Sequence, residues 1–492
     1  MKRRLKTIAI TGTAIVLLSG LLAALAVRLI DVERYRPQAE AAITEATGLD
    51  CSLGKLSLGL WPLPHLHSEH PVLSHAGQPV LQAERITISA YLRPLLRRRL
   101  ELRAITVTKL TATLRRDRQG NLNLLPPRKP RPEPSAAPPL AGLHIEKIVL
   151  DDANLRYENV ITGFTAAANH LNCTIGPFPL LEQGGKAYSS VDDFLATAAL
   201  NGEMEATSMT LNALTMDQPA LHFTVGNNTL TATPITASVY GGKLDATLTL
   251  TDLATSPQLA LAGAIDNLDV AGLSVALNHK SRLTGRLHVT ATLATGGRDH
   301  RISLRRLNGT VAMRGRNLTL QNIDLDTILT QYAKSQEIGL FDLASIFIVG
   351  PFGPLLSKAV DLSGTALGVG RGSSRITQLA SDWTLRNGIA TTKDVAFATP
   401  GHRLAFKGRL DFPAKRFRDF RIGVLDSRGC ATFTQTVNGS FRDPQVEKAS
   451  FFTKTIVNPL VSLFQRGTTA LTGNKPACTP FYRGRVPHPA TP

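Results

Sequence analysis

Four histidines near the start of the chain come closest, by residue type and spacing, to a metal site. His65, His67, His70 and His75 lie close together, with Glu69 among them. In a strand, His65 and His67 would share one face and could hold a metal ion. Prolines at 62, 64 and 71 interrupt the stretch, and no further ligand set recurs along the chain. We therefore interpret these histidines as exposed side chains of a loop or edge strand and predict no metal.

The sequence has none of the common catalytic motifs. The GxSxG elbow, the HExxH zinc motif and the GxxxxGK[ST] phosphate loop are absent. Gly368, Gly370 and Gly372 lack the spacing of a dinucleotide fingerprint and are more typical of loops or bulges. We expect neither an enzyme nor a cofactor, and a hydrolase would rest on the histidine cluster alone.

Four cysteines are too few for a disulfide scaffold, and none stands in a CxxC pair. In an oxidising compartment Cys430 and Cys478 could form a bridge that ties the C-terminal tail to the last strands. We interpret Cys51 and Cys173 as small, buried apolar residues.

The elements that position these residues begin with a candidate membrane anchor. Residues 7–27 form an uncharged run of 21, preceded by Lys2, Arg3, Arg4 and Lys6. A helix of about 20 apolar residues crosses a bilayer, and basic residues before it favour a cytoplasmic N-terminus. A cleaved signal peptide is the alternative, because Ala24-Leu25-Ala26 resembles a peptidase site, although the run exceeds the roughly 7–15 residues of a signal core. We predict a cytoplasmic tip over 1–6 and an anchor over 7–30.

The net charge of +18 is concentrated in one zone. Residues 93–131 contain twelve Lys or Arg and two acidic residues, which gives +10. Close behind a membrane anchor, such a zone favours anionic lipid headgroups over nucleic acid, and a solvated strand face is the alternative. The candidate headgroup residues are Arg97, Arg98, Arg99 and Arg103.

Most of the remaining chain alternates apolar and polar residues, which is typical of strands with one apolar face. The clearest stretches are 85–92, 244–251 and 283–293. Gly241-Gly242, Gly296-Gly297 and Asn387-Gly388 predict hairpin turns, so we expect an antiparallel meander. The candidate groove residues on the apolar faces are Ile86, Ile88, Leu244, Leu248, Leu250, Leu287, Val289 and Leu293.

Helices are few. We predict short helices over 32–47, ended by Gly48, over 323–335 and over 340–348. We also predict an apolar amphipathic helix from Phe451 to Phe464 that covers the sheet or enters a membrane interface. Seven prolines within 126–139 predict a stiff linker or loop over 126–140. The remaining regions are then an N-terminal β region (31–125), a central meander (141–300), a C-terminal β region (301–447) and a helix with a tail (448–492).

So many apolar strand faces need a cover, and the predicted helices are too few to supply it. Either two sheets pack as a sandwich, or one elongated antiparallel sheet curls into a hydrophobic groove that a ligand covers. Leu, Ala, Val, Ile and Gly dominate the inward positions, and they suit acyl chains as well as a protein core. The fold class is mainly β in both cases.

Several segments together resemble AsmA family proteins. The N-terminal ones are Ala46-Thr47-Gly48, the run LSLGLWPLP at 56–64, Ala83-Glu84-Arg85-Ile86, the run LRPLL at 92–96 and the run RDRQGNLN at 116–123; the C-terminal ones are NGIATTKDV at 387–395 and GSFRDPQV at 439–446. The resemblance implies a single-pass protein of the Gram-negative inner membrane, with its bulk in the periplasm. It also implies kinship with chorein-type bridge-like lipid transfer proteins, whose strands build a taco-shaped groove.

From this resemblance we expect a protein that binds phospholipids and conducts them towards the outer membrane or an outer-membrane partner protein. The second hypothesis is a structural or assembly factor that regulates targeting or insertion of outer-membrane proteins. The first requires open apolar faces that take up acyl chains. The second requires faces packed as an ordinary dry core.

Overall fold

The computed structural model describes residues 31–61, 63–96, 101–123, 144–179, 199–253, 255–276, 283–298, 304–335, 372–447 and 478–489, with short pieces at 194, 196–197, 301–302 and 450–451. The chain divides into two compact units, residues 1–235 and 236–492. The boundary falls inside strand β15 (Thr229–Val239) and inside the central region that we predicted over 141–300. The finer division into regions stays a prediction.

The first unit opens with a short 3-10 helix, η1 (Val32–Tyr35), and helix α2 (Arg36–Thr47), as the sequence predicted. Gly48 ends α2 in the left-handed conformation, with φ 72°, and its N–H donates to the Thr44 carbonyl. Glu33 and Glu40 accept hydrogen bonds from the N–H groups of Leu56 and Leu53, 2.8 Å in each case. These carboxylates attach the helical segment to the edge of the sheet.

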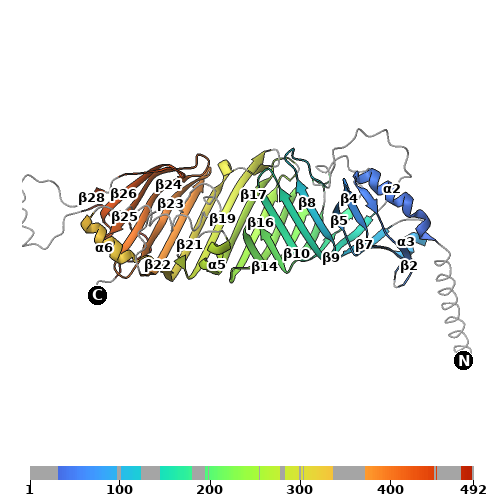
Figure 1. Ribbon diagram of the computed structural model, residues 1–492, viewed down its shortest axis with the longest axis horizontal. Helices are drawn as coiled ribbons and strands as arrows, with labels where there is room; N and C mark the ends of the chain where they lie inside the picture. Colours follow the sequence, from blue (N-terminus) through green and yellow to red (C-terminus); the bar gives the residue numbers. More distant parts are fainter. Residues whose placement is uncertain are drawn as a thin grey trace, which may run out of the picture. The chain divides into compact units, whose positions relative to one another are not determined.

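The sheet of the first unit is mixed (Figure 1). Its strands are β1 (Asp50–Ser52), β2 (Leu56–Gly59), β3 (His65–Glu69), β4 (Val72–His75), β5 (Gln78–Gln82), β6 (Arg85–Ala90), β7 (Glu101–Thr108), β8 (Thr111–Arg116), β9 (His144–Asn159), β10 (Phe164–Gly176), β11 (Phe178–Pro179), β12 (Leu200–Glu205), β13 (Ser208–Leu211) and β14 (Leu214–Gly226). The short helix α3 (Leu92–Leu96) follows β6. Long strand β9 pairs first with β7 and then with β8.

Both of these pairings are parallel, so the prediction of a purely antiparallel sheet is wrong in the first unit. Parallel neighbours need a crossover connection of about a dozen residues or more. The chain between β8 and β9 supplies that length, and it contains the proline-rich stretch 126–140, which lies outside the described residues. Alternation in a sequence identifies the faces of a strand but not the direction of its neighbour.

The second unit is an antiparallel meander. Its strands are β16 (Gly242–Thr251), β17 (Gln258–Asp269), β18 (Leu283–Thr284), β19 (Arg286–Arg298), β20 (Arg301–Ile302), β21 (Asn308–Leu320), β22 (Ser374–Arg386), β23 (Ile389–Ala398), β24 (Arg403–Asp411), β25 (Arg416–Leu425), β26 (Ala431–Ser440), β27 (Pro444–Val446) and β28 (Ser450–Phe451). Asn387 and Gly388 form the predicted turn between β22 and β23, with φ 50° and 75°. The predicted turn at Gly296-Gly297 is wrong, because β19 continues through both glycines.

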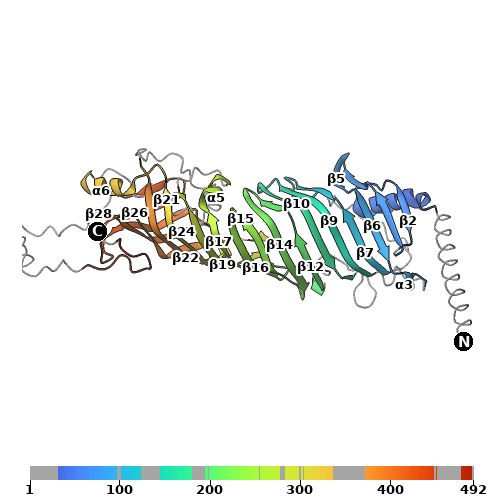
Figure 2. The same ribbon diagram turned by 90° about the horizontal axis from the view of Figure 1, so that it is seen from below.

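Helices are few among the described residues of the second unit, as Figure 2 shows. They are α5 (Val270–Ala276), the 3-10 turn η2 (Leu304–Arg306) and α6 (Leu325–Ser335), which confirms the helix that we predicted over 323–335. The helix predicted over 340–348 lies outside the described residues. Phe451 lies in strand β28, paired with Phe433, and the rest of the predicted helix beyond it is outside the described part.

The C-terminal segment 478–489 packs on the sheet of the second unit. A disulfide joins Cys478 to Cys430, with 6.2 Å between the two Cα atoms. Tyr482 and Val486 are buried against small side chains of β22, β23 and β24, namely Ala380, Ala396, Ala398 and Ala405. Val486 N–H donates to the Tyr482 hydroxyl, which donates in turn to the Asp394 carboxylate.

The candidate anchor at 7–30 lies outside the described residues. Within the described ranges, no helix is both long enough and apolar enough to cross a membrane. The anchor stays a prediction from the sequence.

Candidate functional site

Apolar side chains form rows across the sheet of the first unit, and two of these rows contain predicted groove residues. The register aligns Leu66 of β3 with Ile88 of β6, and Ile88 with Ile105 of β7. The complete first row is Leu58, Leu66, Ile88, Ile105, Ile148, Ile175, Gly202 and Phe223; the second is Ile86, Val107, Leu150, Cys173, Met204 and Leu221. The predicted groove residues Ile86 and Ile88 therefore each belong to a row that continues over several strands.

Most side chains in these rows are half-exposed, so protein atoms cover them only in part. Cys173 is an exception at 8% exposed, and burial, followed by the charge of Glu203, raises the pKa of its thiol. Gly202 leaves space for the Phe223 ring, whose Cζ lies 2.4 Å from where a Cβ of residue 202 would be. The rows thus form a smooth apolar surface without a side-chain charge.

The opposite face of the same strands is polar. His67, Thr87 and Thr106 face one another across β3, β6 and β7. Glu203 of β12 pairs with His222 of β14 on that face. The period-two alternation of the sequence therefore separates an apolar face from a polar one in this unit.

The second unit continues the same pattern on β16, β17 and β19. Leu248 pairs with Leu261, and Leu261 with Leu293. The neighbouring rows on this face are Leu244, Ile265, Val289 and Met313, and then Leu250 and Leu259. Leu244, Leu248, Leu250, Val289 and Leu293 are half-exposed, whereas Leu287 is only 5% exposed. Leu287, which pairs with Leu268, belongs to the buried core, unlike the other predicted groove residues of this unit.

Towards β22 and the later strands, this apolar face becomes a closed core. Trp383, Phe397 and Phe420 are at most 1% exposed, and the Trp383 and Phe420 rings stack with their centroids 6.4 Å apart. Leu325 and Leu329 of α6 belong to the same core. In the second unit the half-exposed rows of β16–β19 thus lead into a packed aromatic core.

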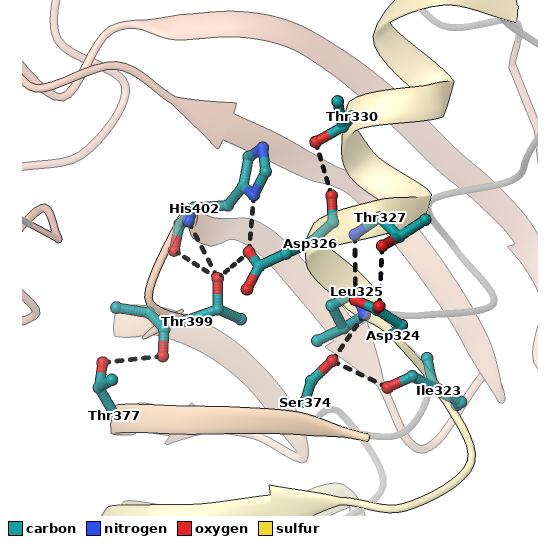
Figure 3. Close-up of polar contacts among 11 residues, drawn as sticks. Ile323, Asp324, Leu325, Asp326, Thr327, Thr330, Ser374, Thr377, Thr399 and His402 are labelled. Atoms are coloured by element: carbon teal, nitrogen blue, oxygen red, sulfur yellow. Dashed lines mark hydrogen bonds and ion pairs between the residues drawn. The ribbon is translucent and has the colours of Figure 1, made fainter. Parts of the chain in front are cut away.

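Helix α6 is fastened to the sheet at its first turn, as Figure 3 shows. The Ser374 hydroxyl donates to the Ile323 carbonyl, 2.8 Å, and accepts from the Leu325 N–H, 2.6 Å. The Asp326 carboxylate accepts from the Thr399 hydroxyl, 2.5 Å, and lies 2.8 Å from His402 Nδ1. The Thr399 hydroxyl bonds to the Asp326 carboxylate and to backbone atoms of His402. We therefore interpret Asp326, Thr399 and His402 as a structural contact between α6 and the sheet.

The four histidines do not converge on one point, and only two of them are in contact. His65 and His67 stack on β3, with 5.8 Å between ring centroids, and His67 Nε2 bonds to the Ser57 hydroxyl. Burial lowers the pKa of His67, with His65 and Arg85 adding to the effect. Over the described ranges, no group of three or more His, Cys, Asp or Glu side chains is placed to hold a metal ion.

Arg103 is an exposed residue of β7, whereas Arg97, Arg98 and Arg99 lie outside the described residues. The headgroup patch therefore stays a prediction.

Alternation in the sequence did not reveal the row residues of β9, β10 and β12, among them Ile148, Ile175 and Met204. In β9 the apolar residues Ile148, Val149 and Leu150 are consecutive, which hides the alternation. The register is regular here, and Val149 is an apolar residue on the polar face, where it pairs with Thr106 of β7 and Thr174 of β10.

The described residues define a class of mainly β proteins whose sheets separate an apolar face from a polar one. The sequence model of the AsmA family matches residues 1–169 and 187–395, so the chain belongs to the AsmA family. Comparisons with curated proteins and with solved structures returned no match.

Proposed function

We propose that this AsmA family protein is anchored in the inner membrane of the Gram-negative envelope and binds phospholipids, which it conducts towards the outer membrane. The acyl chains lie along the apolar rows and the headgroups stay in water. The proposed role requires no catalytic residue and no cofactor. Family membership supports an envelope role in lipid handling or assembly.

The observation that carries the proposal is the half-exposed state of the row residues in both units. Burying an acyl chain against such a surface contributes about 0.8 kcal/mol per CH₂, so a few methylenes outweigh thermal energy without any polar site. No single side chain is then essential, and a charge within a row should be the effective perturbation.

Native mass spectrometry with lipid extraction tests the proposal on the full chain, purified from envelope membranes. The informative variants are Ile105→Asp in the first unit and Leu248→Asp in the second, because both residues are half-exposed members of rows. We expect each to reduce the phospholipid bound per chain by about half, since each unit presents its own rows.

Matched controls are Thr106→Asp and Thr249→Asp, which place the same charge one residue away on the polar face. They should leave bound phospholipid unchanged. Equal losses in the row and control variants, or a wild-type chain without phospholipid, would contradict the proposal.

The packed core under β22–β26 favours the second candidate function for that part of the chain, a structural or assembly role. Two results together would support it. The chain would purify without lipid, and its deletion would impair the insertion of outer-membrane proteins.

A further inference from the structure

Among the described residues of the first unit, the most exposed large apolar side chain is Trp61, at 87%. It follows β2 in the turn that leads to β3. A single exposed apolar residue needs no explanation, but a nearly bare indole costs more than other side chains to leave in water. The residues around Trp61 therefore show whether it is part of a larger exposed apolar surface.

The turn of Trp61 lies beside the end of β6, where two further apolar side chains are exposed. The Ala90 N–H donates to the Pro64 carbonyl, 2.9 Å, which joins the turn to the last residue of β6. Tyr91 and Leu92 come next in the chain and are 36% and 51% exposed. Figures 1 and 2 both draw β2 and α3 at the same end of this unit.

The turn is held in place from the polar face of the sheet. The His65 ring covers Gly59, where a Cβ would meet the ring at 2.4 Å, and His65 Nδ1 lies 2.9 Å from the Leu63 carbonyl. His67 stacks on His65 and bonds to Ser57. The histidines singled out in the sequence thus brace the hairpin that presents Trp61.

Cationic and polar groups border the exposed apolar residues. Arg93 of α3 and Arg103 of β7 are exposed. The Tyr91 hydroxyl donates to Glu146, which raises the pKa of Tyr91, while the charge of Arg103 opposes that rise. The Tyr91 phenol therefore has an anchored polar end and a ring partly in water.

The predicted anchor precedes this edge of the sheet in the sequence. The uncharged run 7–27 precedes η1, and η1 is bonded through Glu33 to Leu56, the first residue of β2. Trp61 follows five residues later, about 17 Å along an extended strand. A membrane anchor at 7–30 would hold this edge of the sheet at a bilayer.

We call the surface formed by these residues the Trp61 surface; it consists of Trp61, Tyr91, Leu92, Arg93 and Arg103. We propose that the Trp61 surface docks on an anionic phospholipid bilayer, with the indole at the boundary between headgroups and acyl chains. Trp and Tyr prefer this boundary because one part of each ring is apolar and another makes hydrogen bonds. The arginines contact anionic headgroups. The inference rests on the proposed membrane location, but it does not require lipid conduction.

Tryptophan fluorescence offers a direct test, because the chain has two tryptophans and the other, Trp383, is 1% exposed. The full chain is reconstituted into nanodiscs of phosphatidylethanolamine and phosphatidylglycerol, and the signal of Trp61 is obtained by subtracting that of Trp61→Phe. We expect this signal to be quenched by brominated lipids and shielded from iodide. A Trp61 signal open to iodide and insensitive to brominated lipids would overturn the proposal and leave a protein partner as the occupant.

The matched control moves the tryptophan to the far end of β9. Ile161 is 57% exposed in the turn after β9, about 50 Å along that strand from its start beside β7. In the Trp61→Phe, Ile161→Trp double variant, the new indole should be open to iodide and unaffected by brominated lipids. Equal lipid quenching at both positions would also overturn the proposal, because it would show that the bilayer contact is not specific to the Trp61 surface.

Phospholipid bound to Trp61→Phe separates this inference from the proposed function. Retained phospholipid with an altered membrane contact supports the docking surface as a separate feature. The opposite outcome is a chain that binds no phospholipid although its Trp61 fluorescence is quenched by brominated lipids. That outcome would refute the lipid groove and still support the docking surface.

Discussion

Asp324 is the residue that caps the N-terminus of α6. Its carboxylate accepts hydrogen bonds from the Thr327 N–H, 3.0 Å, and from the Thr327 hydroxyl, 2.8 Å. These two bonds hold the pKa of Asp324 below its ordinary value, against a smaller opposing effect of burial. The cap positions Leu325 and Leu329, which close the core of the second unit.

We predict that Asp324→Ala lowers the free energy of unfolding by about 1 kcal/mol at neutral pH, the usual cost of losing a cap. Because the folded pKa is depressed, this stabilisation is present above the ordinary pKa and is lost as the pH falls through the folded one. The difference in urea midpoint between wild type and variant should therefore shrink below about pH 4. Asp324→Asn, which keeps a capping oxygen, is the control and should stay closer to wild type than Asp324→Ala. A gap for Asp324→Ala that is constant into acid would contradict the contribution of the ionised carboxylate.

The C-terminal segment acts as one element whose attachment is partly covalent. The Cys430–Cys478 disulfide closes a loop with a sequence separation of 48. Arg403 supports the segment by donating to the carbonyls of Val486, 3.1 Å, and Asp426, 3.0 Å. The disulfide adds to the stability that these contacts give, because it reduces the conformational entropy of the unfolded chain.

We predict that the double variant Cys430→Ser, Cys478→Ser is less stable by about 2–4 kcal/mol. A reductant should lower the unfolding midpoint of the wild type by a similar amount and leave that of the double variant unchanged. Cys51→Ser, at a free and half-exposed cysteine, is the matched control and should unfold like wild type. A reductant effect that persists in the double variant would refute this role of the bridge.

At the scale of elements, local patterns predicted more than pairings did. The alternation over 244–251 predicted β16 and its two faces, because each side chain responds to its own side of the sheet. The parallel neighbours of β9 could not be predicted, since pairing joins segments distant in the sequence. Nor could alternation show that Leu287 is buried while Leu248 is half-exposed, because this depends on what covers the face.

At the scale of the whole molecule, binding and conduction make different demands. Each unit presents its own apolar rows, so each could retain lipid alone. Conduction along the chain would require the rows of both units in the same pathway. Lipid occupancy and lipid transfer should therefore respond differently to a charge placed in one unit.

We predict that Ile105→Asp and Leu248→Asp each abolish transfer of fluorescent phospholipid from vesicles carrying the full chain to acceptor vesicles, although each leaves lipid bound to the other unit. The double variant should transfer no less than either single one, because a pathway in series is already blocked by one barrier. Thr106→Asp with Thr249→Asp should transfer like wild type. If the two row variants each halved transfer and the double variant abolished it, the units would be acting as independent lipid carriers, and the conduit would be replaced by a shuttle.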